Sequence, residues 1–174
     1  MLKGRTALVT GSTRGIGEAA ARTLAAQGCN IMMNGCGDAD DIEAKRAQIE
    51  VESGSTVRYH DADLSDEKQL DDLVDCAEAV FGGIDILVNN AVIRYFHTVD
   101  DFERDNWRHA LSVNVTAPFF LMQRVLPGMR KRGWGRIINM ASVLGLGARG
   151  GRADYVTSKT AIIGLTRAVA AETK

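Results

Sequence analysis

The sequence has 174 residues, of which 45% are apolar and 25% charged, and this fits one globular domain. Lys and Arg number 21 against 22 Asp and Glu, and a net charge of −1 argues against a nucleic-acid or membrane-surface partner. The three cysteines lack C-x-x-C spacing. The first predicted strand follows the N-terminus without a leader pattern, and no apolar stretch is long enough to cross a membrane. These features predict a cytoplasmic protein. The three histidines show no metal-ligand spacing, so no metal site is expected.

Short apolar runs rich in β-branched residues alternate with longer helical patterns along the whole chain. Strands are predicted at residues 5–10, 30–34, 56–64, 84–91 and 135–142. Helices are predicted at 17–28, 39–52, from a cap at Ser65 to about Phe81, at about 101–131 and at 153–172. Pro118 and Pro127 should divide the fourth helical region into at least two pieces. The alternation predicts an α/β fold, a doubly wound parallel sheet with helices on both faces, and the apolar fourth and fifth strands should be buried on both sides.

The first strand ends in "TGSTRGIG", in which Gly11, Gly15 and Gly17 precede a helix. A tight turn at this place needs residues that tolerate positive φ and a backbone free of Cβ atoms. The helix that follows offers free N–H groups and the positive end of its dipole to a pyrophosphate. The strand–turn–helix setting therefore predicts dinucleotide binding.

This glycine spacing, with the motifs that follow it in order, resembles the short-chain dehydrogenase/reductase family along the whole chain. The resemblance implies a Rossmann-type sheet of strand order 3-2-1-4-5. It implies a cofactor site built from Gly11, Thr13, Arg14, Gly15, Ile16, Gly17, Asp63, Leu64, Asn90, Ala91, Tyr155 and Lys159. It also implies a catalytic set of Asn114, Ser142, Tyr155 and Lys159. The stretches "MLKGRTALVTGST", "NGCGDA" and "GRIINMAS" look like the 3-hydroxybutyrate dehydrogenases within that family.

The residue types themselves suit acid–base chemistry. Tyr155 and Lys159, at i and i+4, lie on one face of a helix. A tyrosine side chain ordinarily has a pKa near 10, and a neighbouring ammonium favours the phenolate. Tyr155 could then take a hydroxyl proton as hydride passes to a nicotinamide, while Ser142 hydrogen-bonds the reacting oxygen. The resemblance gives Lys159 a contact with the nicotinamide ribose and Asn114 a water in the proton relay.

Two residues point in opposite directions on the choice of cofactor. Asp38, after the second strand, has the spacing of an acid that binds the ribose hydroxyls of NAD, although it could instead cap the next helix. Arg14, inside the glycine turn, could pair with the 2′-phosphate of NADP. NAD or NADP is therefore expected, and the resemblance to the NAD-using hydroxybutyrate branch favours NAD.

The resemblance implies that Arg94, Ser142, Leu144, Arg152 and Tyr155 face the substrate. Arg94, Leu144 and Arg152 stand where that branch implies glutamine, histidine and lysine, so hydroxybutyrate itself is not a secure substrate. Arg94, Arg149 and Arg152 follow the fourth and fifth strands, where open α/β sheets bind ligands. A guanidinium suits a carboxylate, which favours a hydroxy or oxo acid; solvated loop arginines are the alternative.

Two departures from the family pattern bear on activity. Val92 replaces the glycine of "NNAG", and a β-branched residue would be strained there if the position needs positive φ. The family's sixth and seventh strands have no counterpart in the 174 residues, so we expect a single dinucleotide-binding domain over 1–174, truncated at the C-terminus, with the fifth strand as an open edge.

The last two helical regions are apolar over more than one stripe, and the resemblance implies a homo-oligomer through them. The sequence thus predicts an NAD(P)-dependent oxidoreductase that transfers a hydride between a secondary alcohol or ketone and the nicotinamide. The alternative is a catalytically impaired dinucleotide-binding or interaction module.

Overall fold

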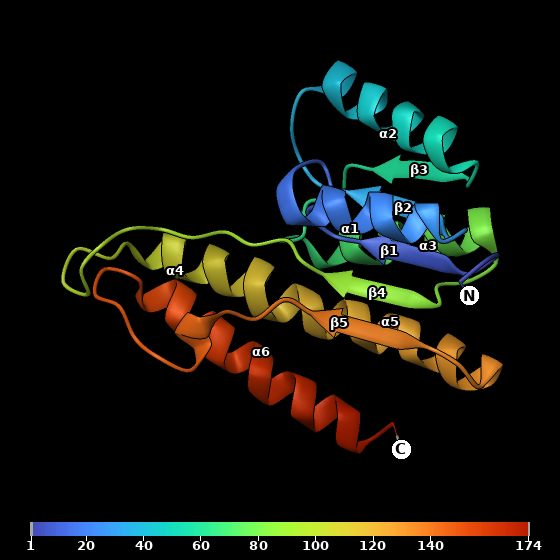
Figure 1. Cartoon of the computed structure of the whole chain (residues 1–174). Helices are drawn as coiled ribbons and strands as arrows, with labels where there is room; N and C mark the ends of the chain where they lie inside the picture. The colour runs from blue at the N-terminus through green and yellow to red at the C-terminus, as the bar shows by residue number, and fades with distance from the viewer. Residues whose placement is uncertain (1, 174) are drawn as a thin grey trace.

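The computed structural model, which describes residues 2–173, contains one parallel sheet of short strands (Figure 1). Its order is β3-β2-β1-β4-β5, as predicted. The strands are β1 (Thr6–Val9), β2 (Asn30–Asn34), β3 (Val57–His60), β4 (Ile86–Asn89) and β5 (Arg136–Asn139). In the central strands β1, β2 and β4 the side chains alternate between two covered faces. In β1, for example, Leu8 faces one hydrophobic cluster, and Ala7 and Val9 face another.

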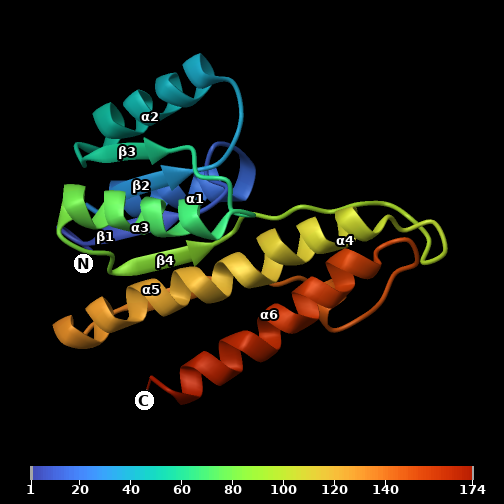
Figure 2. The same cartoon turned by 180° about the vertical axis from the view of Figure 1, so that it is seen from behind.

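Helices cover both faces of the sheet. They are α1 (Gly15–Ala26), α2 (Ala39–Ser53), α3 (Glu67–Phe81), α4 (Arg104–Leu111), α5 (Ala117–Arg132) and α6 (Ala153–Ala171). Helices α1 and α2 lie in front of the sheet in Figure 1, and α3 and α5 come to the front in Figure 2. Leu165 and Val169 of α6 pack against the same cluster as α3 and α5. None of the helices within residues 2–173 combines the length and apolar character that crossing a bilayer requires.

The helices begin and end within three residues of the predicted bounds. Asp66, and not Ser65, caps α3: its carboxylate accepts from Lys68 N, whereas the hydroxyl of Ser65 donates to Asp63 at 2.8 Å. The fourth helical region is in more than one piece, as predicted, but a π-helical turn, η1 (Ser112–Thr116), divides α4 from α5 in place of the prolines. Pro118 lies in the first turn of α5, where a missing N–H costs little, and Pro127 lies inside α5 without ending it.

The fifth strand is less buried than predicted. Among the described residues β5 pairs with β4 only, so it forms an edge of the sheet. Ile138 is 45% exposed and Arg136 is exposed as well. The prediction that β5 is covered on both sides is therefore wrong, because α5 and α6 cover only one of its faces.

Candidate active site

The glycine turn lies at the carboxyl end of β1 and leads directly into α1, which begins at Gly15. Gly11 and Gly15 have φ values of 61° and 59°, which L-residues rarely adopt. A Cβ at Gly17 would overlap the carbonyl oxygen of Gly11 and the side-chain amide of Asn90. The turn is therefore built from bare backbone, with the first N–H groups of α1 free for an anion, and it fits a pyrophosphate.

The chain after β4 is fastened to this turn. Asn90 donates its side-chain amide to the carbonyl oxygens of Thr10 and Gly11 at 3.0 Å each. The hydroxyl of Thr10 accepts from the backbone N–H groups of Asn90 and Ala91 at 3.0 and 3.1 Å. The sequence predicts strain at Val92 if its position needs positive φ. In the described chain only glycines have positive φ, so the backbone of Val92 is not strained in this way. Val92 is 41% exposed.

Asp63 and Leu64, which the resemblance places in the cofactor site, lie at the same sheet edge, just beyond β3. Leu64 is 9% exposed, and the Asp63 carboxylate accepts from the backbone N–H and hydroxyl of Ser65 at 2.8 Å. In the glycine turn, Thr13 is buried and Ile16 is 68% exposed. The side chain of Ile16 is therefore not packed against the rest of the protein.

The two candidates for cofactor choice have different surroundings. Asp38 is the N-cap of α2, and its Oδ1 accepts from Asp40 N and Asp41 N at 3.0 and 3.1 Å. This is the alternative role that the sequence left open. Arg14 is exposed, and no ion pair or side-chain hydrogen bond engages it among residues 2–173. Lys45 of α2 donates to the carbonyl oxygen of Thr13 at 3.0 Å.

Lys159 is held beside Tyr155 on α6. Its side chain is 5% exposed, and its Nζ donates to the carbonyl oxygen of Met140 at 2.5 Å. The same Nζ is 5.8 Å from the centroid of the Tyr155 ring. Burial lowers the pKa of Lys159, because the charged form loses solvation. Met140 follows β5 directly, so the carbonyl group that accepts from Lys159 lies two residues before Ser142 in the same segment.

Ser142 is the N-cap of the short 3₁₀ helix η2 (Val143–Gly145), and its hydroxyl oxygen accepts from Leu144 N at 3.2 Å. Helix η2 lies between Ser142 and α6 in the chain. A Cβ at Gly145 would press on the backbone of Lys159, and the hydroxyl of Thr160 donates to the Gly145 carbonyl at 3.1 Å. The segment that carries Ser142 therefore packs directly on the helical turn that carries Lys159.

Asn114 lies in the π-helical turn η1 and is 2% exposed. Its Oδ1 accepts from Ile93 N at 2.8 Å, and its Nδ2 donates to Ile93 O at 2.7 Å and to the hydroxyl of Ser158 at 3.2 Å. Inserting a π turn re-aims side chains within a helix and often marks a functional position. The contact with Ser158 places Asn114 next to the α6 turn of Lys159.

Arg152, one of the arginines predicted to face the substrate, is the N-cap of α6. The guanidinium of Arg152 stacks over the ring of Phe96 at 3.2 Å, and His97 and Arg152 form an isolated backbone bridge. Arg94 is exposed, Arg149 is exposed, and Leu144 is half-buried. In the described chain no hydrogen bond or ion pair links Arg94 or Arg152 to Ser142 or Tyr155. The structure thus gathers these residues at one end of α6 without joining them.

Sequence reasoning missed three groups at this edge. Lys45 is one of several cations on a polar helix, and nothing in its spacing marked it. Thr10 reads as the last residue of a strand. Asp154 reads as a first-turn acid, yet it is fully buried: its Oδ2 accepts from Tyr95 N at 2.9 Å, and its Oδ1 has no hydrogen-bond partner in the described structure. The adjacency of Asp154 to Tyr155 was the only available signal.

No group of three or more His, Cys, Asp or Glu side chains within residues 2–173 is arranged to hold a metal ion. The site that the structure does assemble lies at the carboxyl edge of the sheet, where α/β folds bind their ligands.

Comparisons with known proteins agree with this arrangement. The family described as short chain dehydrogenase matches residues 5–174. The chain is 47% identical over 173 residues to D-beta-hydroxybutyrate dehydrogenase of Cupriavidus necator, covering 99% of this chain and 66% of that protein, just under two thirds of its length. The crystal structure of a metagenomic short-chain oxidoreductase in complex with NADP is similar, with a TM-score of 0.92 and 32% identity over 98% of this chain and 77% of the other.

The structure of NAD+-bound xylitol dehydrogenase is similar as well, with a TM-score of 0.91 and 34% identity over 99% of this chain and 66% of the other. Both the sequence match and the strand order extend over nearly all of the described residues. The chain belongs to the short-chain dehydrogenase family.

Proposed function

We propose that this chain, as one dinucleotide-binding domain, carries the cofactor site and the acid–base centre of an NAD(P)-dependent oxidoreductase acting on secondary alcohols or ketones. The observation that carries the proposal is the buried Lys159, held beside Tyr155 by the Met140 carbonyl at the same sheet edge as the glycine turn. A bound nicotinamide dinucleotide would supply the hydride acceptor or donor. Gly11, Gly15 and Gly17 would hold its pyrophosphate, with Leu64 and Asp63 beside the adenine.

The chain's own residues would move the proton. Tyr155 takes the proton of the substrate hydroxyl, or returns it in the reverse direction. Lys159 favours the phenolate through its nearby positive charge. Ser142 is the N-cap residue of η2, and its hydroxyl donates to the reacting oxygen. Asn114 keeps the chain after β4 in place through Ile93 and can hold a water through its remaining capacity as an acceptor.

The arginines near α6 favour a hydroxy or oxo acid as substrate. Arg94 is exposed on the segment that follows β4, and Arg152 is fixed by stacking on Phe96. A guanidinium fixed in this way offers its donors to a carboxylate. The similar protein from Cupriavidus necator is named for a hydroxy acid, so 3-hydroxybutyrate is the first substrate to test.

Assembly and location are part of the same proposal. Phe119 of α5 is 42% exposed, which supports a homo-oligomer through α5 and the neighbouring α6. A small-molecule substrate in the cytoplasm remains the expected setting.

The test is to follow reduced-nicotinamide absorbance with purified chain, NAD+ or NADP+, and 3-hydroxybutyrate or other secondary alcohols. Tyr155→Phe should abolish turnover while calorimetry shows that cofactor binding is kept. Tyr95→Phe is the matched control, because the Tyr95 hydroxyl contacts His109 on α4. Cofactor binding with no turnover by the unmodified chain on any such alcohol would support the alternative, a dinucleotide-binding module.

A further inference from the structure

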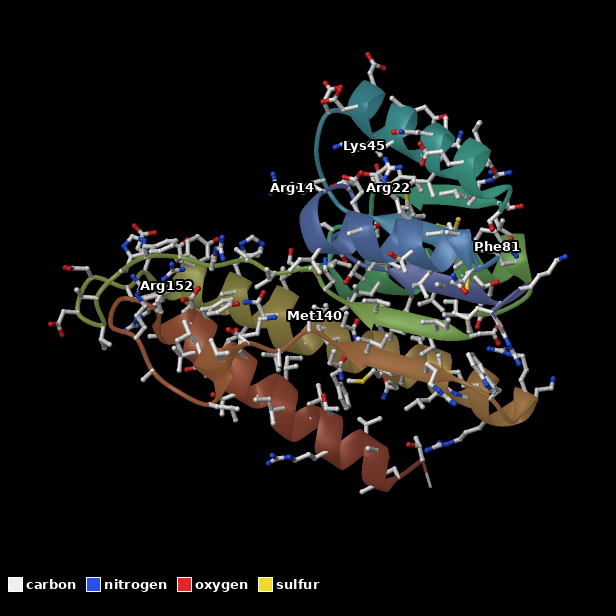
Figure 3. All side chains as sticks on the ribbon, viewed as in Figure 1. Arg14, Arg22, Lys45, Phe81, Met140 and Arg152 are labelled. Carbon is white, nitrogen blue, oxygen red and sulfur yellow. The ribbon has the colours of Figure 1, made fainter. Side chains whose placement is uncertain are left out.

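The chain after β4 runs as an extended strap (residues 91–97) beside the start of α6. Its odd-numbered residues are half-buried and its even-numbered residues are exposed, as in a strand with one covered face. His97, at the end of the strap, forms a backbone bridge with Arg152. Figure 3 shows Arg152 where this connection meets the start of α6. Arg94 is therefore presented on the exposed side of the strap.

Two buried side chains hold the strap on either side of Arg94. Asn114 binds both backbone groups of Ile93, at 2.8 and 2.7 Å. Asp154 is 0% exposed, and its Oδ2 accepts from Tyr95 N at 2.9 Å. Because the residues before and after Arg94 are both anchored, the directions that its side chain can take are limited.

The strap is held by one face of α6, next to the face that carries the acid–base pair. Asp154 and Ser158 stand at i and i+4 on that helix, and the hydroxyl of Ser158 accepts from Asn114 Nδ2 at 3.2 Å. Tyr155 and Lys159 form a second pair of the same spacing, one residue further along. The same turns of α6 thus fix the strap relative to the reacting centre.

A buried carboxylate is a costly anchor for a single N–H group. No cationic side chain among residues 2–173 lies within ion-pairing distance of Asp154, and its Oδ1 has no hydrogen-bond partner among them. Removing an ionised carboxylate from water without such partners opposes folding. The first turn of α6 offsets only part of this cost, because a negative charge there complements the helix dipole. The remaining cost favours a role in function over a role in packing.

We propose that Asp154 is a positioning residue for substrate recognition. It holds Tyr95 N, and through the strap it orients Arg94 towards the carboxylate of a hydroxy or oxo acid. The proposal rests on the oxidoreductase function proposed above and deepens it. A guanidinium on an anchored backbone loses less conformational freedom on binding a carboxylate than one on a loose segment, so the anchor improves affinity for the acid.

The test is steady-state kinetics with 3-hydroxybutyrate and with its methyl ester, which has the same secondary alcohol without the charge. Asp154→Ala should raise KM for the acid at least about tenfold and change kcat less than about threefold, with KM for the ester within about twofold. Asp154→Asn should restore most of the loss, since its Oδ1 can still accept from Tyr95 N. Asp66→Ala is the matched control and should leave both KM values unchanged, because Asp66 also accepts from a backbone N–H at a helix start, that of Lys68 at 2.9 Å.

A double-mutant cycle shows whether Asp154 acts through Arg94. Arg94→Ala should raise KM for the acid as Asp154→Ala does, and the double variant should lose no more than Arg94→Ala alone. Calorimetry repeats the cycle without turnover, with acetoacetate titrated into chain that is saturated with the oxidised dinucleotide it binds. Asp154→Ser, whose hydroxyl is one bond closer to the helix, replaces Asp154→Ala if that variant does not fold.

The outcomes separate the two proposals. Equal losses for acid and ester, additive losses in the cycle, or no loss at all would overturn the role of Asp154 and leave the oxidoreductase standing. No turnover by chain that binds the dinucleotide would overturn the proposed function, whereas acetoacetate binding that follows the cycle would still support the role of Asp154. Neither turnover nor acetoacetate binding by such chain would overturn both.

Discussion

The ammonium of Lys159 donates to the carbonyl oxygen of Met140 at 2.5 Å, and this contact ties α6 to the chain just beyond β5. No carboxylate within the described residues lies within ion-pairing distance of Lys159, so a positive charge is buried on a carbonyl dipole alone. Burial of this kind is costly for folding, and it lowers the pKa of Lys159. A residue kept at such a cost next to Tyr155 fits a catalytic purpose better than a structural one.

Lys159→Met should therefore abolish turnover without destabilising the fold. Methionine has a similar length and removes the buried charge, so the free energy of unfolding at neutral pH should stay the same or rise. Turnover should fall at least about 100-fold, because Tyr155 loses its cationic neighbour. Urea denaturation and a nicotinamide assay measure the two effects; a large loss of stability would contradict the argument.

The same variant gives a pH test. An unfolded lysine keeps its proton to about pH 10.4, whereas the lowered pKa of Lys159 releases it earlier in the folded protein. Between these two values the unfolded state binds more protons, so the free energy of unfolding of the unmodified chain should rise with pH relative to Lys159→Met. Parallel curves for both proteins up to pH 10 would show that Lys159 does not titrate in this way.

Asn114→Ala should cost stability at the junction of β4, η1 and α6. The substitution leaves the N–H and carbonyl groups of Ile93 without the side-chain partners found at 2.8 and 2.7 Å. A loss of about 2 kcal/mol in the free energy of unfolding is expected. Asn106→Ala is the control, since its amide makes only a 3.4 Å contact with Glu103 at the surface, and it should change stability by less than about 0.5 kcal/mol.

The fold was predictable from the sequence because its signals are local. Buried apolar runs predicted the strands, and the glycine turn predicted where α1 begins. The site was only partly predictable, since Lys45 and Asp154 act through contacts with residues distant in sequence, Thr13 and Tyr95. The cap of α3 was decided between neighbours, because Asp66 caps the helix in place of Ser65. Asp38 caps α2, one of the two roles that the sequence left open for it. The exposure of β5 could not be deduced from its apolar sequence, because apolar residues show that a strand can be buried but not whether another element covers it.

Gly17→Ala should remove dinucleotide binding, whereas Gly164→Ala should not. A Cβ at Gly17 meets the Gly11 carbonyl and the Asn90 amide, so the turn must open, at a cost of about 1–3 kcal/mol. A Cβ at Gly164, in α6, meets nothing within 4 Å, and alanine there should stabilise the chain by about 0.5–1 kcal/mol. Thermal unfolding and calorimetry with NADP+ compare the pair; retained binding by Gly17→Ala would mean that the turn does not hold the pyrophosphate.

Glu50→Gln should destabilise α2 against β3 in a pH-dependent way. Hydrogen bonds from Arg46, from Val57 N and from Arg58 lower the pKa of Glu50 to about 2. Because the folded pKa lies below the unfolded value, the contribution is complete above about pH 4.3 and is lost as the pH falls towards 2. The carboxylate is partly solvated, so the loss at neutral pH should be no more than about 1 kcal/mol. With Glu78→Gln as control, urea titrations should show a deficit at pH 7 that is much smaller at pH 2.

Two apolar side chains of nearly equal exposure offer competing routes to assembly. Phe119 on α5 is 42% exposed, and Ile138 on the edge strand β5 is 45% exposed. If copies associate through α5 and α6, Phe119→Asp should convert the oligomer to monomer in sedimentation velocity, because a charge would be buried in an apolar contact. Ile138→Lys should then leave the oligomer intact and reduce only non-specific aggregation, since a charged side chain on an edge strand disfavours pairing with the strands of other chains. Dissociation by Ile138→Lys alone would instead place the association at the sheet edge, by pairing of β5 with a strand of another copy.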